Sequence, residues 1–324
     1  MASVSMKRAL VTGGLGFIGS HLVDRLLDGG WGVTVLDNLL TGHSSNLSHR
    51  KDDPRLRIVV GDIRKPRTVS RVVAGCDVVF HFAAHALMRV SLGNPAADLG
   101  NNLFGTLNVL RIAASEGVSD FVFASTSALY GEAEVTPTPE DYLGTQTSFY
   151  GAAKLAGEAF GSVYTQFTPM RFWAFRFGTV LGERCRRGAI WDFEHQLMRN
   201  PRKLEILGNG GQAKDYVSVE DCIDGIMLGY EKGAKRVNVF NLGLEERTTV
   251  DELADIVIEE MGLVNVRKRY TGGVRGWVGD NPSVRLSNER IRRLGWKPKA
   301  SPSDAIRLTA RWTLEEIGGR TAER

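Results

Sequence analysis

Short β-branched or apolar runs alternate with helix-length amphipathic segments through the first 125 residues, and this alternation constrains the fold most strongly. The runs lie at 8–12, 32–36, 56–60, 77–82 and 120–125, and the segments between them include 17–29 and 98–116. Such alternation is typical of βαβ units, which build a parallel sheet covered by helices on both faces. The sequence therefore predicts an α/β fold with a doubly wound parallel sheet.

The pattern loosens after a helix expected to begin near Ser148 and an apolar run at 171–182. Beyond this run, helices are expected at 189–199, 219–231, 249–261 and 302–317, and extended segments at 204–207 and 237–242. We expect residues 1–180 to form the first domain and residues 181–324 to form mainly a smaller α/β lobe, which can return one strand or helix to the first domain.

The composition, with 43% hydrophobic and 24% charged residues, is that of a globular protein. The three cysteines, Cys76, Cys185 and Cys222, are too scattered for a disulfide framework or a metal site, which favours reduced thiols. The sequence shows no signal-peptide pattern and no run of the roughly 18 apolar residues that a membrane helix needs. A net charge of +4 without a long basic tract does not indicate nucleic-acid binding. We expect a cytoplasmic protein with no metal, membrane or nucleic-acid partner.

A glycine-rich turn joins the first expected strand to the first expected helix in LVTGGLGFIGSHLVDRLL. Gly14, Gly16 and Gly19 have G-x-G-x-x-G spacing, and Gly13 precedes them. Glycines at these positions allow a tight turn, close approach to a pyrophosphate and close packing of helix on strand. The turn predicts a dinucleotide site, although a glycine turn without a ligand is the alternative for the motif alone.

Acidic residues end the second and third expected strands. Asp37 can accept hydrogen bonds from ribose hydroxyls and would repel a 2′-phosphate, so it favours NAD over NADP. The alternative is that Asp37 only shapes the turn in DNLLTG. Asp62 can accept a hydrogen bond from an adenine amino group.

The segment TSFYGAAK places Tyr150 four residues before Lys154, so both side chains lie on one face of a helix. An ammonium and a cationic nicotinamide ring both favour the phenolate, which can take a proton from a substrate hydroxyl. Thr126 or a neighbouring serine, at the end of the fifth strand, can bind the same oxygen. The alternatives are a solvated Y-x-x-x-K helix and hydroxyl groups that only cap a loop.

Together, several motifs in order along nearly the whole chain resemble the extended short-chain dehydrogenase/reductase family, in particular its NAD-dependent sugar-nucleotide epimerases and dehydratases. The motifs are TGGLGFIGS, LDNLLTG, GDIR, HFAAH, NNLFGT, STSALYG, YGAAK and GNGGQAKDYVSVEDC. The resemblance implies a Rossmann-type NAD-binding domain at 1–180, which carries the catalytic residues, and a substrate-binding lobe mainly at 181–324.

The resemblance also assigns roles to individual residues. Tyr150 is expected to be the catalytic base, Lys154 to hold the nicotinamide ribose and lower the tyrosine pKa, Thr126 to take the catalytic Ser/Thr place, and Asn102 to be the structural asparagine of the active site. The NAD site is expected to include Gly13, Gly16, Phe17, Ile18, Gly19, Asp37, Asn38, Asp62, Ile63, Ala83 and Ala84, with Tyr150 and Lys154. Substrate contacts are expected from Thr126, Thr179, Lys214 and Arg275. The helices near 98–116 and 148–165 are expected to form a homodimer interface.

The residues after Thr126 narrow the type of reaction that the resemblance implies. Related dehydratases and decarboxylases usually have an acidic residue in the next two positions, whereas this chain has Ser127 and Ala128. The pattern is similar to that of 4-epimerases acting on nucleotide-diphosphate sugars, such as UDP-glucose and UDP-galactose or their uronic or N-acetyl forms. The alternatives are a 4,6-dehydratase or decarboxylase of the same family and, outside enzymes, an NAD-binding regulatory protein.

Overall fold

The computed structural model describes residues 6–86 and 93–322. In this part of the chain seven strands form one sheet, in the order β11-β6-β5-β4-β1-β2-β3. The strands are β1 (Arg8–Thr12), β2 (Gly32–Asp37), β3 (Leu56–Val60), β4 (Val78–His81), β5 (Asp120–Thr126), β6 (Arg171–Phe177) and β11 (Val237–Leu242). β1 pairs in parallel with both β2 and β4, and the predicted doubly wound α/β fold is confirmed.

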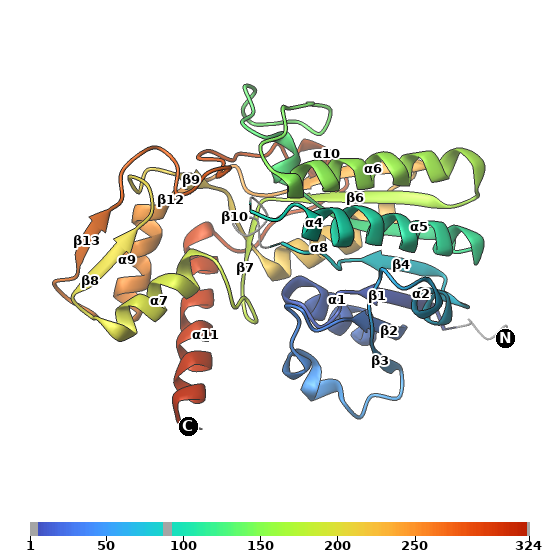
Figure 1. The fold of residues 1–324 in the computed structure, drawn as a ribbon, viewed down its shortest axis with the longest axis horizontal. Coiled ribbons are helices and arrows are strands. Elements are labelled where there is room, and N and C mark those ends of the chain that lie inside the picture. The colour runs from blue at the N-terminus through green and yellow to red at the C-terminus, as the bar shows by residue number, and fades with distance from the viewer. Residues whose placement is uncertain (1–5, 87–92, 323–324) are drawn as a thin grey trace. The chain divides into compact units, whose positions relative to one another are not determined.

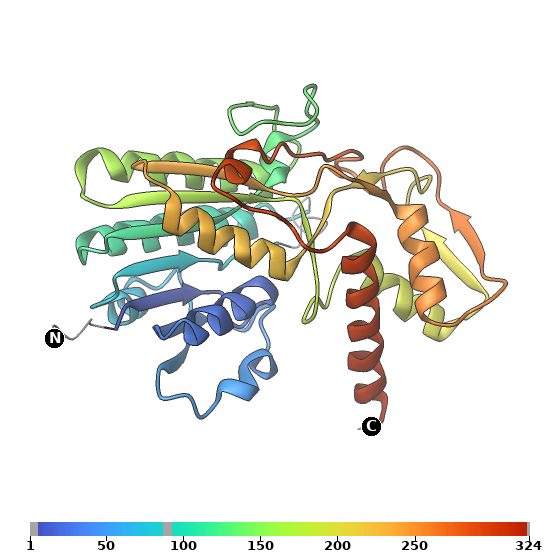
Figure 2. The same ribbon diagram turned by 180° about the vertical axis from the view of Figure 1, so that it is seen from behind.

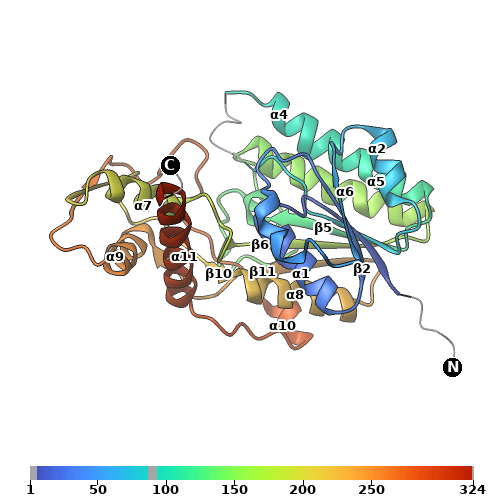
Figure 3. The ribbon, with the colours of Figure 1, turned by 90° about the horizontal axis from the view of Figure 1, so that it is seen from below.

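Helices cover both faces of this sheet (Figures 1 and 3). One face carries α2 (Pro66–Val73), α5 (Thr106–Ser115) and α6 (Phe149–Phe167). The other face carries α1 (Phe17–Asp28) and α8 (Val219–Lys232), as the view from behind shows (Figure 2). The central strands are buried on both sides. The apolar side chains of β1 and β4 have almost no solvent-exposed surface.

The core under α2, α5 and α6 is aromatic where β5 crosses it. Phe121 and Phe123 of β5 pack against Phe172 of β6, with ring centroids 6.0 and 6.1 Å from Phe172. All three side chains are essentially inaccessible to solvent. Burial of aromatic groups of this size fixes the position of β5, whose end carries Thr126.

Two expected elements are divided in the structure. The segment 98–116 comprises α4 (Ala96–Asp98), the π-helix η2 (Leu99–Gly105) and α5. The apolar run 171–182 breaks at Gly178 into β6 and β7 (Thr179–Leu181). A Cβ atom on Gly178 would lie 2.6 Å from Asp215 Oδ1, so the chain can pass this carboxyl only as glycine.

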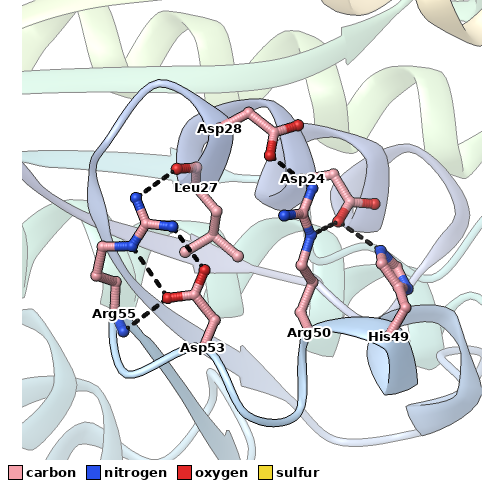
Figure 4. Close-up of polar contacts among 7 residues, drawn as sticks. All are labelled: Asp24, Leu27, Asp28, His49, Arg50, Asp53 and Arg55. Atoms are coloured by element: carbon pink, nitrogen blue, oxygen red, sulfur yellow. Dashed lines mark hydrogen bonds and ion pairs between the residues drawn. The ribbon is translucent and has the colours of Figure 1, made fainter.

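A network of ion pairs holds the connection after β2 against α1 (Figure 4). The connection includes the 3₁₀ segment η1 (Ser44–Arg50), and Asp24 accepts from His49 at 2.7 Å and from Arg50 at 2.8 Å. Arg55 donates to the Leu27 carbonyl at 2.8 Å. These contacts hold the later part of the connection between β2 and β3, although exposed pairs of this kind each contribute little stability.

By its internal contacts the chain forms two compact units. The first comprises the chain up to Leu129, Ser148–Arg176 and Ile226–Phe240. The second comprises Tyr130–Thr147, Phe177–Gly225 and the chain from Asn241 onward.

The second unit contains short strand pairs and helices. β7 pairs with β10, β9 with β12, and β8 with β13. The remaining bounds are β8 (Lys203–Ile206), β9 (Ala213–Lys214), β10 (Tyr216–Ser218), β12 (Thr248–Thr249), β13 (Arg267–Tyr270), η3 (Ser127–Tyr130), α7 (Ala189–Arg199), α9 (Val250–Glu260), α10 (Glu289–Arg293) and α11 (Pro302–Ala322). An apolar cluster from α7, α9 and α11 forms its core.

Glu194 of α7 is an ionisable group in the second unit with no exposed surface. Neither of its carboxyl oxygens has a hydrogen-bond partner within the described ranges. Burial raises the pKa of Glu194 from 4.5 to about 8, because the ionised form loses its hydration. The carboxyl is therefore held in its neutral form at neutral pH.

Replacement of Glu194 by glutamine is expected to remove a pH-dependent loss of stability. Because the folded-state pKa is raised, the native wild-type protein holds a proton that the unfolded chain releases, so stability falls as the pH rises from 4.5 to about 8. Calorimetry should give equal Tm values near pH 4.5 and a variant more stable by at least about 1 kcal/mol at pH 8. Exposed Glu246→Gln is the control, and equal Tm values for E194Q and wild type at pH 8 would contradict the prediction.

Candidate active site

The carboxyl ends of four neighbouring strands lie at one edge of the sheet. β2, β1, β4 and β5 are adjacent in this order and their pairings are parallel. Asp37 ends β2, Gly13 follows β1, Phe82 to Ala84 follow β4, and Thr126 ends β5. The strand register thus brings these predicted residues to the edge where ligands bind in open α/β sheets.

The glycine turn lies directly against the backbone that leaves β4. Gly13 has a φ of +71°, and a Cβ atom on it would lie 2.6 Å from the Ala83 nitrogen. A Cβ atom on Gly19 would overlap the Gly13 carbonyl oxygen, which also accepts a hydrogen bond from Gly16 N–H at 3.0 Å. Glycine is therefore required at both positions for steric reasons.

The N-terminus of α1 fits a pyrophosphate. Its N-cap is Gly16, no side chain caps the first turn, and the first turn holds no acidic residue. Phe17 and Ile18, the first two residues of the helix, are only partly buried. Free amide groups and the positive end of the helix dipole favour an anion at this position.

Asp37 is 7% exposed and accepts hydrogen bonds from the amides of Leu15 at 3.0 Å and Leu39 at 2.8 Å. Burial raises the pKa of Asp37, while these amides act in the opposite direction. The two bonds orient the carboxylate and leave further lone pairs for ribose hydroxyls. Asn38 accepts a hydrogen bond from the amide of Leu40 at 3.1 Å.

The other predicted adenine-side residues already have protein partners. Both Asp62 oxygens accept hydrogen bonds from Arg64, and this guanidinium lowers the pKa of Asp62. Ile63 is buried, and its carbonyl accepts a hydrogen bond from Asn108 at 2.6 Å. The proposed contact of Asp62 with an adenine amino group stays a prediction.

Tyr150 and Lys154 lie in the first turns of α6. The helix begins after Ser148, whose hydroxyl oxygen accepts the amide of Gly151 at 3.1 Å. Tyr150 is partly buried, and the Lys154 ammonium lies 5.8 Å from the centroid of its ring. The segment TSFYGAAK is therefore both a capped helix start and a tyrosine–lysine pair.

Lys154 is 1% exposed, which is unusual for a lysine. Its Nζ donates to the carbonyl oxygen of Ala124 at 2.7 Å and lies 4.6 Å from the centroid of the Phe123 ring. Burial lowers the pKa of Lys154 to about 7, and the negative charge of Glu158 opposes this shift. The ammonium is thus bonded to β5 two residues before Thr126. The Thr126 Oγ1 atom accepts a hydrogen bond from the amide N–H of Ala128 at 3.1 Å.

Asn102 is fully buried in the π-helix η2 and holds the chain that leaves β4. Its side chain accepts from the amide of His85 at 2.7 Å and donates to the carbonyl of the same residue at 2.8 Å. It also donates to Asp98 at 2.6 Å. These contacts agree with a structural role beside Ala83 and Ala84.

A buried polar group that was not predicted from the sequence lies behind the tyrosine–lysine pair. Glu158 accepts from Ser125 Oγ, and Arg176 donates to both of its carboxylate oxygens. The signal was present, because Glu158 follows Lys154 by four residues on the same helical face. His81 of β4 is buried between the hydroxyls of Thr12 and Thr106.

The remaining substrate-binding candidates belong to the second unit. Lys214 Nζ lies 2.8 Å from Asp280 Oδ1 and also donates to the Asn281 carbonyl. Arg275 pairs with Glu132, and the amide of Thr179 donates to the Asp215 carbonyl at 3.1 Å. Both cations thus have partners within this unit, and their contacts with substrate stay predictions.

The described ranges contain no group of three or more His, Cys, Asp or Glu side chains that could hold a metal ion. In the same ranges, no helix has both the length and the apolar character needed to cross a membrane. The sheet order, the glycine turn and the placement of Asp37 define a dinucleotide-binding α/β protein.

Comparisons with known proteins specify this class. The pattern of the NAD-dependent epimerase/dehydratase family matches residues 9–243, and the chain belongs to this family. It is 31% identical to the UDP-glucose 4-epimerase of Mycolicibacterium smegmatis over 93% of this chain and 97% of that protein. The predicted family and the predicted cofactor, NAD, are confirmed.

Solved structures support the same family assignment. The UDP-glucose 4-epimerase of Thermotoga maritima, crystallised with UDP-glucose, has a TM-score of 0.87 and 32% identity over 96% of this chain and 99% of that chain. The UDP-glucose 4-epimerase of Thermus thermophilus in complex with NAD has a TM-score of 0.83 and 32% identity over 94% and 98%. A further relative by sequence, the UDP-glucuronic acid decarboxylase 4 of Arabidopsis thaliana, is 29% identical over 96% of this chain and 70% of that protein.

Replacement of Gly19 by alanine is expected to weaken NAD binding. The added methyl group would overlap the Gly13 carbonyl and displace α1 from the turn, at a cost of roughly 1–3 kcal/mol. The NAD content of the purified protein and titration with NAD should show binding at least about tenfold weaker. Gly318→Ala, in α11, meets no neighbouring atom within 4 Å and is the control. Wild-type affinity in G19A would contradict the turn geometry.

Proposed function

We propose that this protein is an NAD-dependent 4-epimerase of a UDP-hexose, of the UDP-glucose/UDP-galactose type or a uronic or N-acetyl form. The observation that carries the proposal is the junction of β5 and η3. There Thr126 is followed by Ser127 and Ala128, without the carboxylate expected of dehydratases and decarboxylases. The UDP-glucose 4-epimerases among the relatives support this choice.

In the proposed mechanism, NAD bound at the glycine turn supplies a reversible hydride acceptor for C4 of the sugar. Tyr150 takes the proton of the 4-hydroxyl and later returns a proton to the same oxygen on the other face of the sugar. Lys154 stabilises the phenolate electrostatically, because its ammonium lies beside the ring in a site with little water. Thr126 donates a hydrogen bond to the reacting oxygen and orients it.

The cofactor is expected to be held by the first compact unit. Gly13, Gly16 and Gly19 would admit the pyrophosphate, and Asp37 would bind the adenine ribose. The lobe at 181–324 is proposed to bind the nucleotide sugar, with Lys214 and Arg275 as candidates, together with Thr179 just before the lobe. Release of Lys214 from Asp280 would free its ammonium for a phosphate.

Incubation with a panel of UDP- and dTDP-sugars is expected to give an isomer of unchanged mass, measured by chromatography with mass spectrometry. Tyr150→Phe should lower turnover at least about 10²-fold, because the proton acceptor is lost, while NAD stays bound. Tyr164→Phe makes the same chemical change further along α6 and is the matched control.

Other products of the same incubation decide between the alternatives. Loss of water would indicate a 4,6-dehydratase, and loss of carbon dioxide a decarboxylase. Absence of turnover for every sugar, with NAD bound, would favour a regulatory role. Near-normal turnover in Y150F would contradict the assignment of the base.

A homodimer is proposed to form through η2, α5 and α6. Phe149, Val163 and Phe167 lie at helical spacing on α6 and are 45%, 53% and 66% exposed. Leu99 and Phe104 of η2 are 44% and 61% exposed. Small residues between the exposed aromatic groups of α6, such as Ala156, would let a partner helix approach closely. Several exposed apolar side chains on neighbouring helices are typical of protein interfaces.

Combined replacement of Val163 and Phe104 by glutamate is expected to give a monomer, because each subunit would place charges in an apolar contact. Light scattering after size-exclusion chromatography measures the mass. Leu143→Glu, at an 80% exposed apolar residue outside these helices, is the control. A wild-type protein that is monomeric at micromolar concentration would refute the proposal.

A cytoplasmic location stays a prediction from the sequence.

A further inference from the structure

Glu158 is a buried carboxylate that the mechanism above does not use. It is 7% exposed and lies one helical turn beyond Lys154 and two turns beyond Tyr150. We propose that Glu158 is a positioning residue that favours the ammonium form of Lys154 and fixes the end of β5 that carries Thr126. This inference rests on the proposed function of Tyr150 and Lys154.

Two contacts tie α6 to consecutive residues of β5. Lys154 Nζ donates to the Ala124 carbonyl at 2.7 Å, and Ser125 Oγ donates to Glu158 Oε1. Thr126 is the next residue of the strand. A shift of Glu158 would therefore move the backbone that places the Thr126 hydroxyl, and small displacements of a reacting group lower rates strongly.

Arg176 of β6 holds the carboxylate in place from the other side. Its Nε lies 3.0 Å from Glu158 Oε1 and its terminal nitrogen 2.7 Å from Oε2, which is a bidentate pair. Arg176 is 5% exposed. A buried charge pair of this kind contributes little net stability compared with an apolar pair, so a role in orientation and charge explains it better than stability does.

The groups around Lys154 leave Glu158 as its principal negative neighbour. On α6 these groups are Tyr150 and Glu158, and β5 presents the Phe123 ring and the Ala124 carbonyl. β4 presents His81, whose burial lowers its pKa to about 3 and keeps it neutral. Other charged groups on packed elements include Asp98 of α4, bound to Asn102, Asp120 of β5, paired with Arg171, and Arg176 of β6, bound to Glu158.

This arrangement has a defined electrostatic effect. Burial lowers the pKa of Lys154 to about 7, and Glu158 raises it. Without the negative charge of Glu158, the lysine would lose its proton at a lower pH, and the neutral amine would no longer stabilise the Tyr150 phenolate. The direct effect of Glu158 on Tyr150 is smaller, since the carboxylate is two turns away and paired with Arg176.

The test replaces Glu158 by glutamine, which keeps the shape and removes the charge. The ultraviolet phenolate absorption of each protein, minus that of its Y150F counterpart, gives the Tyr150 titration without any turnover. In E158Q this titration is expected to move to higher pH by at least about half a unit. In the pH profile of kcat for E158Q, the alkaline limb should move to lower pH, while KM stays within about twofold of wild type.

Glu158→Asp keeps the charge and should retain the wild-type titration and pH profile. Ser125→Ala removes only the hydroxyl and should lower kcat severalfold without moving either titration. Circular dichroism and NAD content check folding, and if E158Q does not fold, S125A still decides the positioning part. An unchanged Tyr150 titration in folded E158Q, or wild-type kcat in S125A, would overturn the proposal. If wild-type protein converts no sugar, the proposed function fails, whereas the titration still decides the role of Glu158.

Discussion

The contact between the glycine turn after β1 and the backbone leaving β4 is the constraint on which the rest of the site depends. Because Gly13 has no side chain, the turn can lie directly on Ala83, and α1 can begin immediately beside it. The parallel register then carries Asp37 and Thr126 to the same edge. A cofactor site and a catalytic strand end thus follow from one close backbone approach.

The first unit could be predicted well because its signals are local. Apolar runs predicted the strands β1 to β5, and the G-x-G-x-x-G spacing of Gly14, Gly16 and Gly19 identified the turn. The division of 98–116 by a π-helix and the break at Gly178 could not be predicted in the same way. Both depend on packing against distant residues, such as the carboxyl of Asp215 beside Gly178.

The buried polar contacts of the site also could not be predicted from the sequence pattern. Tyr150 and Lys154 form a recognisable motif, but their surroundings come from β5 and β6, which are distant in sequence. Serine, glutamate and arginine are common on protein surfaces, so the residue types alone did not indicate that Ser125, Glu158 and Arg176 meet in the interior. Only the spacing of Glu158 from Lys154 pointed in that direction. The substrate candidates in the second unit were the least predictable, because Lys214 and Arg275 each have partners there.

The single helix α6 bears the tyrosine–lysine pair and Glu158 along one side and an exposed apolar stripe along another. Insertion of one residue between Tyr150 and Glu158 would rotate the following turns by about 100° relative to the preceding ones. Such a change would carry the carboxylate away from Ser125 and misalign the stripe at the same time. Evolution of this helix is therefore expected to proceed by exchange of side chains at constant length, whereas surface loops elsewhere are free to grow or shrink.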